Sequence, residues 1–382
     1  MRLAFITTSL DTGGAEMMLL KLLCGIDRRR FECCVIALGD QGAIGQEIER
    51  LGIPVTALQL RPSLPSPFKL WRLRSVLKRF KPDLVQTWLY HADLFGGLMA
   101  RLASAAPIVW GIRNSNLDPA LVKRSTRLVA KTSARVSNWL PDHILCCSNE
   151  ARDAHVALGY ASNKILVIPN GFDLERFKPD PLTRAQLRQS LGLNDGTKLV
   201  GMVARFDPLK NHVGFIEAAA HISKARPDAQ FLIAGKGIDS TNTVLQQALV
   251  AHGLNKQVHL LGPRTDIPQL MAALDVLVST SHGEAFPNVL GEAMACEVPC
   301  VVTDVGDCAE IVGSTGRVAA AGDMQGIGHA VLEILNMTVD QRQQLGQAAR
   351  QRIQTQYDII SVVNRYEDFY NSLITEVHKD RH

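Results

Sequence analysis

The chain has 382 residues, of which 46% are hydrophobic and 20% are charged, and its net charge is +4. This composition is typical of a globular protein and excludes a disordered or fibrous one. A chain of this length usually forms two domains, because single hydrophobic cores stop growing at about 250–300 residues. The eight cysteines lack metal-ligand spacing, which favours buried thiols and a reducing compartment.

Short apolar segments alternate with helical patterns through the first half of the chain. The first segment, 1–6, is too short for a signal peptide or a membrane-spanning helix and predicts a β-strand. We therefore expect a cytoplasmic protein, at most peripheral to a membrane. The strands predicted for this half are 2–8, 31–38, 55–59, 84–88, 108–112, 143–147 and 165–168. Their alternation with helices predicts a parallel sheet.

Two glycines, Gly13 and Gly14, follow the first predicted strand and open a helix. Glycine lets a ligand approach the backbone, and a helix N-terminus favours negative charge. The alternative is an ordinary tight turn between a strand and a helix. The dinucleotide fingerprint G-x-G-x-x-G is absent.

A histidine, His91, follows the predicted strand 84–88 and precedes a helix that begins near Asp93. It therefore lies at the carboxyl end of a strand, where α/β proteins bind ligands. There it can hydrogen-bond a sugar hydroxyl, although a lone histidine often serves only in packing.

A second strand–helix series follows a polar, proline-containing linker at 177–181. Its predicted strands are 199–204, 230–234, 259–261, 276–280 and 300–303, and from about 324 only helices are expected. We predict an N-terminal Rossmann-like domain, 1–178, and a C-terminal one, 179–355, that face each other across a cleft. The last segment, 356–382, is expected to form a helix that returns to the N-terminal domain.

Two basic residues, Arg205 and Lys210, follow a predicted strand of the second half. They can converge on a diphosphate, since charge-assisted hydrogen bonds suit phosphate oxygens. The alternative is a pair of solvated loop charges.

The most informative segment, 281–295, follows the predicted strand 276–280 and opens a helix near Asn288. It places Glu284 in a loop and Glu292 in the helix. Carboxylates can hold sugar or ribose hydroxyls, while backbone N–H groups at a helix N-terminus hold phosphate. A sugar nucleotide carries both kinds of group, although capping and solvation would also explain the two glutamates.

Together these motifs resemble the retaining glycosyltransferases of family four, which have the GT-B fold. The most specific match is the Glu-x7-Glu pattern from Glu284 to Glu292, and it is joined by the glycine loop at 13–14 and the segments 169–173 and 176–179. Segments 88–97 and 110–115 look like those of members that build bacterial surface polysaccharides.

The resemblance implies a role for each site residue. Glu292 would bind the nucleotide ribose, Glu284 the donor sugar, and Arg205 and Lys210 the leaving diphosphate, with His91 beside the sugar. The residues implied in donor binding are Gly13, Gly14, Arg205, Lys210, Glu284, Ala285, Phe286, Asn288, Val289 and Glu292. Pro287 has no N–H to donate, and many family members have glycine at that position.

The resemblance also implies retention of configuration at the transferred sugar and a nucleotide-sugar donor, commonly a uridine diphosphate sugar, with no cofactor. No Asp-x-Asp motif follows a predicted strand, so Arg205 and Lys210 would take the place of a metal ion. The predicted reaction is transfer to a hydroxyl of a saccharide acceptor in surface polysaccharide synthesis (O-antigen, capsule or exopolysaccharide).

Basic charge is concentrated in the first half of the chain. Residues 1–176 hold 23 Lys/Arg against 15 Asp/Glu, whereas the remainder holds 18 against 22. Two amphipathic helical patterns, at 69–81 and 124–139, carry much of this charge. They suggest peripheral contact with an anionic membrane and a polyprenyl-diphosphate-linked acceptor, although solvated helix faces would look the same.

Two other classes of function remain open on the sequence. A GT-B-fold epimerase would act on the sugar nucleotide without an acceptor, and a non-catalytic binder would hold it without turnover. Nucleic-acid binding is not expected, because no aromatic-rich stacking platform accompanies the basic residues.

Overall fold

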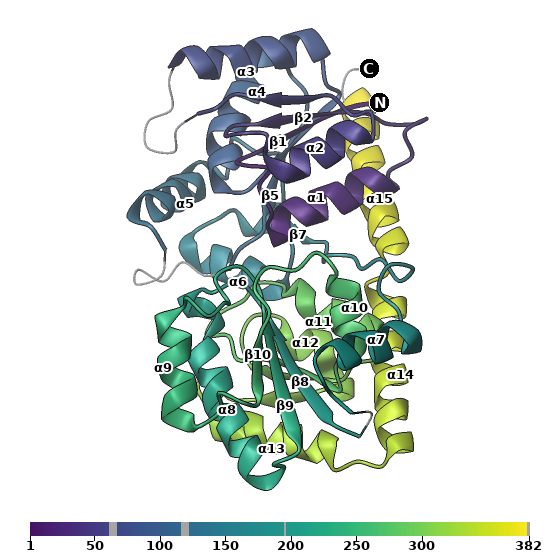
Figure 1. Cartoon of the computed structure of the whole chain (residues 1–382). Helices are drawn as coiled ribbons and strands as arrows, with labels where there is room; N and C mark the ends of the chain where they lie inside the picture. Colours follow the sequence, from purple (N-terminus) through teal and green to yellow (C-terminus); the bar gives the residue numbers. More distant parts are fainter. Residues whose placement is uncertain (61–66, 116–121, 195, 380–382) are drawn as a thin grey trace. The chain divides into compact units, whose positions relative to one another are not determined.

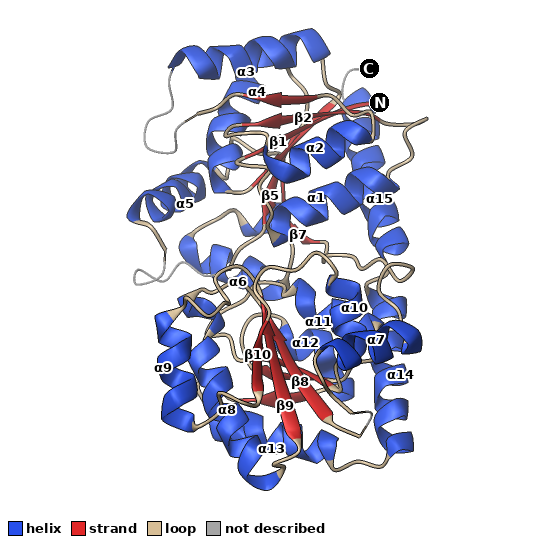
Figure 2. Cartoon of the chain, in the orientation of Figure 1, coloured by secondary structure: helices blue, strands red, loops and turns tan. Residues whose placement is uncertain are grey.

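The computed structural model describes residues 1–60, 67–115, 122–194 and 196–379. The chain forms two compact units, one made of Met1–Gly171 with Ile359–His382 and the other of Phe172–Asp358. Each unit contains a parallel sheet with helices on both faces (Figure 1 and Figure 2). These two Rossmann-like units confirm the predicted α/β fold class.

The sheet of the first unit has seven strands in the order β3-β2-β1-β4-β5-β6-β7, all parallel. The strands are β1 (Arg2–Thr7), β2 (Glu32–Ala37), β3 (Val55–Ala57), β4 (Leu84–Trp88), β5 (Ile108–Ile112), β6 (His143–Cys146) and β7 (Ile165–Val167). The helices are α1 (Gly14–Gly25), α2 (Gly42–Arg50), α3 (Pro67–Phe80), α4 (Gly97–Ala103), α5 (Arg124–Val136) and α6 (Asn149–Leu158), with a π-helical turn η1 (Ala92–Gly96) before α4 and a 3₁₀ turn η2 (Ser162–Lys164) before β7. The inner strands β2, β1, β4, β5 and β6 are mostly buried, as expected for a sheet covered on both faces, whereas the edge strands β3 and β7 are partly exposed.

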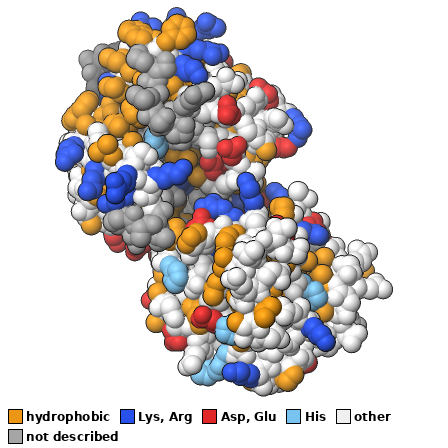
Figure 3. Space-filling view, turned by 60° about the vertical axis from the view of Figure 1, so that its left-hand side comes forward, with side chains coloured by type: hydrophobic (Ala, Val, Ile, Leu, Met, Phe, Trp, Pro, Cys, Tyr) orange, Lys and Arg blue, Asp and Glu red, His pale blue; other side chains and the backbone are white. Residues whose placement is uncertain are grey.

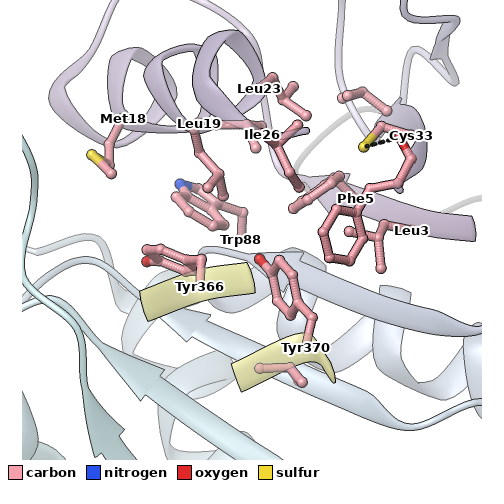
Figure 4. Packing of buried hydrophobic residues seen from close by; sticks show 14 of the residues in the cluster. Leu3, Phe5, Met18, Leu19, Leu23, Ile26, Cys33, Trp88, Tyr366 and Tyr370 are labelled. Carbon is pink, nitrogen blue, oxygen red and sulfur yellow. Dashed lines mark hydrogen bonds between the residues drawn. The ribbon is translucent and has the colours of Figure 1, made fainter. Parts of the chain in front are cut away.

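The C-terminal helix α15 (Ile359–Lys379) completes the core of the first unit. Tyr366 packs on Trp88 with ring centroids 6.5 Å apart, and Tyr370 meets the edge of Phe5 at 6.4 Å (Figure 4). All four side chains are fully buried. The first core is therefore assembled from both ends of the chain.

The sheet of the second unit has six parallel strands in the order β10-β9-β8-β11-β12-β13. The strands are β8 (Lys198–Val203), β9 (Ala229–Ala234), β10 (Val258–Leu260), β11 (Val276–Ser279), β12 (Cys300–Thr303) and β13 (Arg317–Ala319). The helices are α7 (Pro181–Ser190), α8 (His212–Ala225), α9 (Thr243–His252), α10 (Ile267–Ala273), α11 (Asn288–Ala295), α12 (Cys308–Val312), α13 (Met324–Leu335) and α14 (Val339–Gln356), with 3₁₀ turns η3 (Pro208–Lys210) and η4 (Gly313–Thr315).

The border of the second unit lies at Phe172, whereas the sequence placed the domain boundary after residue 178. Phe172 stacks on Phe286 with centroids 6.1 Å apart, and its N–H donates to the carbonyl of Tyr357 (2.8 Å). Phe177 is also buried, and its carbonyl accepts from Arg350 (3.0 Å). The segment that reads as a linker in the sequence is therefore packed into the second unit.

Within the described ranges, no helix combines the length and the apolar sequence that crossing a bilayer requires.

Candidate functional site

The residues predicted for the site lie where each sheet reverses its strand order. In the first sheet the reversal falls between β1 and β4, and in the second between β8 and β11. Open parallel sheets bind ligands outside the carboxyl ends of strands at such a switch point. Gly13 and Gly14 follow β1, His91 follows β4, Lys210 follows β8 and Glu284 follows β11. Each unit therefore brings its own predicted residues to one edge.

An ion pair joins the two loops at the switch point of the second sheet. Lys210 Nζ lies 2.5 Å from Glu284 Oε1, and both side chains are mostly buried. Ser281 Oγ donates to the same carboxylate oxygen (2.7 Å). The Thr280 hydroxyl also lies close to the carbonyl of Asn211 (2.9 Å). These contacts hold the loop after η3 against the loop after β11, and a cation and a carboxylate lie side by side there.

The loop that carries Glu284 rests on backbone that only glycine can supply. Gly306 follows β12 with φ +55°, and a Cβ there would lie 2.2 Å from the carbonyl oxygen of Glu284. The N–H of Asp307 donates to the carbonyl of Ala285 (3.1 Å), and the Thr303 hydroxyl donates to the carbonyl of Ser281 (2.7 Å). The end of β12 and the residues just after it thus hold the loop that carries Glu284 in place.

Arg205 has a different environment from Lys210. It is mostly exposed, and its guanidinium is paired with Asp207 Oδ2 at 3.1 Å. Asp207 also accepts from the N–H of Leu209 (3.0 Å) and so caps η3. The structure thus places Arg205 in the same loop as Lys210 but pairs it with a carboxylate of that loop.

Helix α11 begins at Asn288, close to where the sequence predicted it, and Val289 is its second residue. Ala285 and Phe286 are buried just before it. Glu292 is half-buried and stands one turn into the helix. An α-helix leaves its first N–H groups without intrahelical acceptors, and its dipole favours an anion there. The helix therefore offers an anion-binding end followed by a carboxylate.

In the first unit, the glycine loop closes over a buried carboxylate. Gly13 has extended backbone and precedes Gly14, the first residue of α1. Glu16 folds back so that a Cβ on Gly13 would lie 2.4 Å from its Oε2. The Ser9 hydroxyl donates to Glu16 Oε1 (3.1 Å). A side chain larger than hydrogen at position 13 would displace Glu16.

His91 lies in a turn that is anchored at several points. The indole N–H of Trp88 donates to the carbonyl of Ala15 (2.9 Å), which ties the end of β4 to the glycine loop. Leu89 has a positive φ of 77°, a conformation that costs free energy in a non-glycine residue. Burial lowers the pKa of His91, which favours the neutral imidazole.

The buried carboxylate of Asp93 fastens this turn to the sheet. Its Oδ1 accepts from the Thr87 hydroxyl (2.6 Å) and from the N–H of Gly111 (3.1 Å). Burial raises the pKa of Asp93 to about 8, although both hydrogen bonds and the nearby Arg113 oppose that shift. Asp93 thus joins β4, β5 and the turn that carries His91.

Two of these residues were given no role by the sequence. The sequence pattern indicates Asp93 only as a helix start, and it assigns no role to Gly306. The signal for Gly306 was available, because glycine soon after a predicted strand often marks a close backbone approach. A buried carboxylate such as Asp93 has no comparable sequence signal.

The site of the second unit offers a cation, a carboxylate and a helix N-terminus within one pair of loops. That set can bind a phosphate group and sugar hydroxyls together. Among the described residues, no group of three or more histidine, cysteine, aspartate and glutamate side chains has the arrangement of a metal site.

Two family models match the chain, one for each unit. The model described as Glycosyltransferase Family 4 matches residues 12–176, and the model described as Glycosyl transferases group 1 matches residues 183–352. The two matches together span most of the chain.

Characterised relatives are similar over most of their length. The UDP-Gal:α-D-GlcNAc-diphosphoundecaprenol α-1,3-galactosyltransferase of Escherichia coli is 28% identical over 79% of this chain and 78% of the relative. The N,N'-diacetylbacillosaminyl-diphospho-undecaprenol α-1,3-N-acetylgalactosaminyltransferase of Campylobacter jejuni is 25% identical over 94% of this chain and 96% of the relative.

Among solved structures, the HepE protein of Anabaena in complex with UDP superimposes with a TM-score of 0.85. It is 26% identical, and the match covers 97% of this chain and all of that one. Its complex with UDP-glucose gives a TM-score of 0.84 at 25% identity.

Proposed function

The chain is a glycosyltransferase of family four with the GT-B fold, and we propose that it transfers a sugar from a uridine diphosphate donor to a lipid-linked saccharide. The main support for this proposal is the cluster of Lys210, Glu284 and Ser281 just before α11. Lys210 would neutralise the leaving diphosphate with Arg205, Glu284 would hold the donor sugar, and Glu292 would hold the ribose. The similarity to HepE structures solved with UDP and UDP-glucose supports uridine as the base of the donor.

A binding and transfer assay tests the proposal. UDP-sugars are screened by thermal shift and then assayed with an undecaprenyl-diphosphate-linked saccharide, with and without that acceptor. We expect the donor's thermal shift to be lost in Glu292→Ala. Transfer should fall about a hundredfold in Lys210→Ala, by analogy with loss of one oxyanion donor. Lys224→Ala, which removes an exposed lysine at the end of α8, should change neither.

Two outcomes of that assay would contradict the proposal. Turnover of the donor that is independent of any acceptor would indicate an epimerase. Donor binding without turnover on any lipid-linked saccharide would indicate a binder.

We further propose that transfer retains the anomeric configuration and needs no metal ion. The leaving phosphate would accept the proton of the attacking hydroxyl, and Lys210 would stabilise the charge that develops on that phosphate. His91 would lie beside the donor sugar, where its neutral imidazole would hydrogen-bond a sugar hydroxyl. The anomeric configuration of the product, determined by NMR, tests retention. Activity measured in EDTA tests the metal requirement, and we expect full activity there. Activity that EDTA abolishes and Mg²⁺ restores would overturn the second point.

The acceptor is proposed from the relatives, two of which are named for undecaprenol-linked substrates. Such an acceptor lies in a membrane, so the protein would work at the inner face of the cell membrane during surface polysaccharide synthesis. The basic first unit supports contact with anionic lipid.

A further inference from the structure

Large apolar side chains are exposed on one region of the first unit. Phe68 and Trp71 of α3 are 80% and 59% exposed, and Trp139, just after α5, is 60% exposed. Leu102 of α4 and Leu128 of α5 are more than half exposed. Isolated exposed apolar residues are ordinary, but two tryptophans and a phenylalanine within one region are not.

Hydrogen bonds show that these side chains belong to neighbouring elements. Arg74 Nε donates to the carbonyl of Leu102 (3.1 Å), and the Arg74 guanidinium lies 5.0 Å from the centre of the Trp71 ring. Arg101 Nη2 donates to the carbonyl of Leu140 (2.7 Å), next to Trp139. Helix α4 is therefore tied to α3 on one side and to the segment after α5 on the other.

The same region is strongly basic. Residues 67–139 contain thirteen Lys/Arg and three Asp/Glu, and one of those acids, Asp93, is fully buried. Arg101 is paired with Asp142, and no other of these cations has a carboxylate within 4 Å among the described residues. On α5, Leu128, Lys131 and Arg135 are exposed at helical spacing.

Figure 3 shows basic and hydrophobic side chains gathered on the side of the first unit that carries α3 and α5. Cations around exposed aromatic rings match a bilayer interface, where rings lie among the headgroups and lysine or arginine meets anionic lipid. A nucleic acid would bind the cations of this region but would leave its aliphatic side chains without a partner. A protein–protein interface usually has fewer charged residues at its core than this region has.

We propose that exposed Trp71, Leu102, Leu128 and Trp139, with the cations of α3 and α5, form a docking surface for an anionic bilayer. This inference rests on the proposed function, because a lipid-linked acceptor must be reached in the membrane. Helix α4 follows directly from η1, which begins at the residue after His91. Docking through this surface would therefore hold the acceptor-binding unit at the membrane.

The four tryptophans of the chain allow a direct test with the full-length protein. Trp88 and Trp110 are fully buried, whereas Trp71 and Trp139 are exposed. Vesicles of phosphatidylcholine with phosphatidylglycerol should therefore shift the emission to the blue, and phosphatidylcholine alone should not. The shift should disappear at high salt, and co-sedimentation with the same vesicles should weaken in Trp71→Ala/Trp139→Ala.

Co-sedimentation with the same vesicles measures the electrostatic part. Lys131→Glu/Arg135→Glu should weaken binding about tenfold or more. Lys224→Glu/Lys256→Glu, the matched reversal in the second unit, should change it little. Transfer to a water-soluble acceptor should be unchanged in both variants, which shows that they fold and separates this test from that of the proposed function.

Several results would overturn the docking surface. Unchanged binding in the Lys131/Arg135 variant, or equal binding to neutral vesicles, would show that this region does not meet anionic lipid. A shift caused by a nucleic acid or a soluble anionic polysaccharide, but not by vesicles, would assign the surface to a polyanion instead.

Discussion

At the scale of single residues, Glu284 pairs with Lys210 and is also the residue proposed to hold the donor sugar. Glu284 Oε1 lies 2.5 Å from Lys210 Nζ, so the proposed diphosphate would have to draw the lysine away from a carboxylate. We expect Glu284→Gln to bind UDP about fivefold more tightly, since a partly buried ion pair of about 1 kcal/mol no longer competes. Transfer should fall in the same variant if Glu284 holds the sugar.

Isothermal titration with UDP and steady-state kinetics measure the two effects separately. Glu310→Gln, which changes another carboxylate of the same unit, provides the control. Weaker UDP binding in Glu284→Gln would show that the carboxylate supports the diphosphate site rather than competing with it.

Asp93 gives a residue-scale prediction about pH. Its unfolded carboxyl ionises near pH 4, but the folded protein keeps the proton until about pH 8. Folding therefore takes up a proton between these values, and the free energy of unfolding falls as pH rises from 4 to 8. Asp93→Asn removes this cost and should be more stable than the wild type by roughly 5 kcal/mol at pH 8, with little difference at pH 4.

Denaturant unfolding at several pH values measures that difference. Asp93→Asn keeps an acceptor for Thr87 and Gly111 and should retain transfer, whereas Asp93→Leu loses both hydrogen bonds and should lower it through the His91 turn. A stability difference that does not change with pH would mean that Asp93 is ionised in the folded protein.

At the scale of elements, the hydrophobic pattern was enough to locate twelve of the thirteen strands found among the described residues. The segments 33–38 and 144–147 are continuous apolar runs, and such runs are characteristic of strands buried on both faces. The pattern missed β13 (Arg317–Ala319), an edge strand of three partly exposed residues, because so short a segment has no readable period. The π-helical form of η1 was also beyond prediction, since the sequence pattern does not distinguish it from an α-helical turn.

The first helix of the second unit depends on a buried ion pair that the sequence does not reveal. Arg184 and Arg188 of α7 lie 2.8 and 3.3 Å from the carboxylate of Asp275, just before β11. Burial alone would raise the pKa of Asp275, but the two guanidiniums and the N–H of Leu199 more than offset it, so the pKa is lowered. We expect Asp275→Ala to cost about 3–5 kcal/mol, because Arg188 is left buried without its counter-ion.

Thermal and denaturant unfolding check this expectation against Asp228→Ala. The Asp228–Arg226 pair has a similar distance of 2.9 Å, but its carboxylate is half exposed, so its loss should cost less than about 1 kcal/mol. Because the pKa of Asp275 is lowered on folding, its contribution should be complete above the unfolded pKa and disappear as pH falls through the folded one. Equal costs for the two variants would show that burial does not matter at this pair.

At the scale of the whole molecule, alternation of strands and helices predicts two α/β units but not where they divide. Proline and polar residues near 177–181 favoured a linker, yet buried Phe172 and Phe177 pack into the second unit. Aromatic packing of this kind depends on residues far away in the sequence, such as Phe286 and Tyr357. The same limit applies to the site: the motifs identified Lys210 and Glu284, whereas the ion pair between them became evident only in the folded chain.

The division of the chain predicts different behaviour for the two units in isolation. The core of the second unit consists entirely of its own residues, and Lys210, Glu284 and Glu292 all lie within it. A fragment of residues 172–358 should therefore fold cooperatively and bind UDP. A fragment of residues 1–171 should not fold alone, because its core lacks the aromatic and aliphatic side chains that α15 contributes.

Circular dichroism and thermal shift with UDP test both fragments. Adding a peptide of residues 359–379 to the 1–171 fragment should restore cooperative unfolding, whereas the same peptide with Tyr366→Ala and Tyr370→Ala should not. Large buried aromatic side chains contribute about 3–5 kcal/mol each when truncated to alanine, so the doubly substituted peptide loses most of its affinity. Cooperative folding of 1–171 without any peptide would show that α15 covers a core that is already complete.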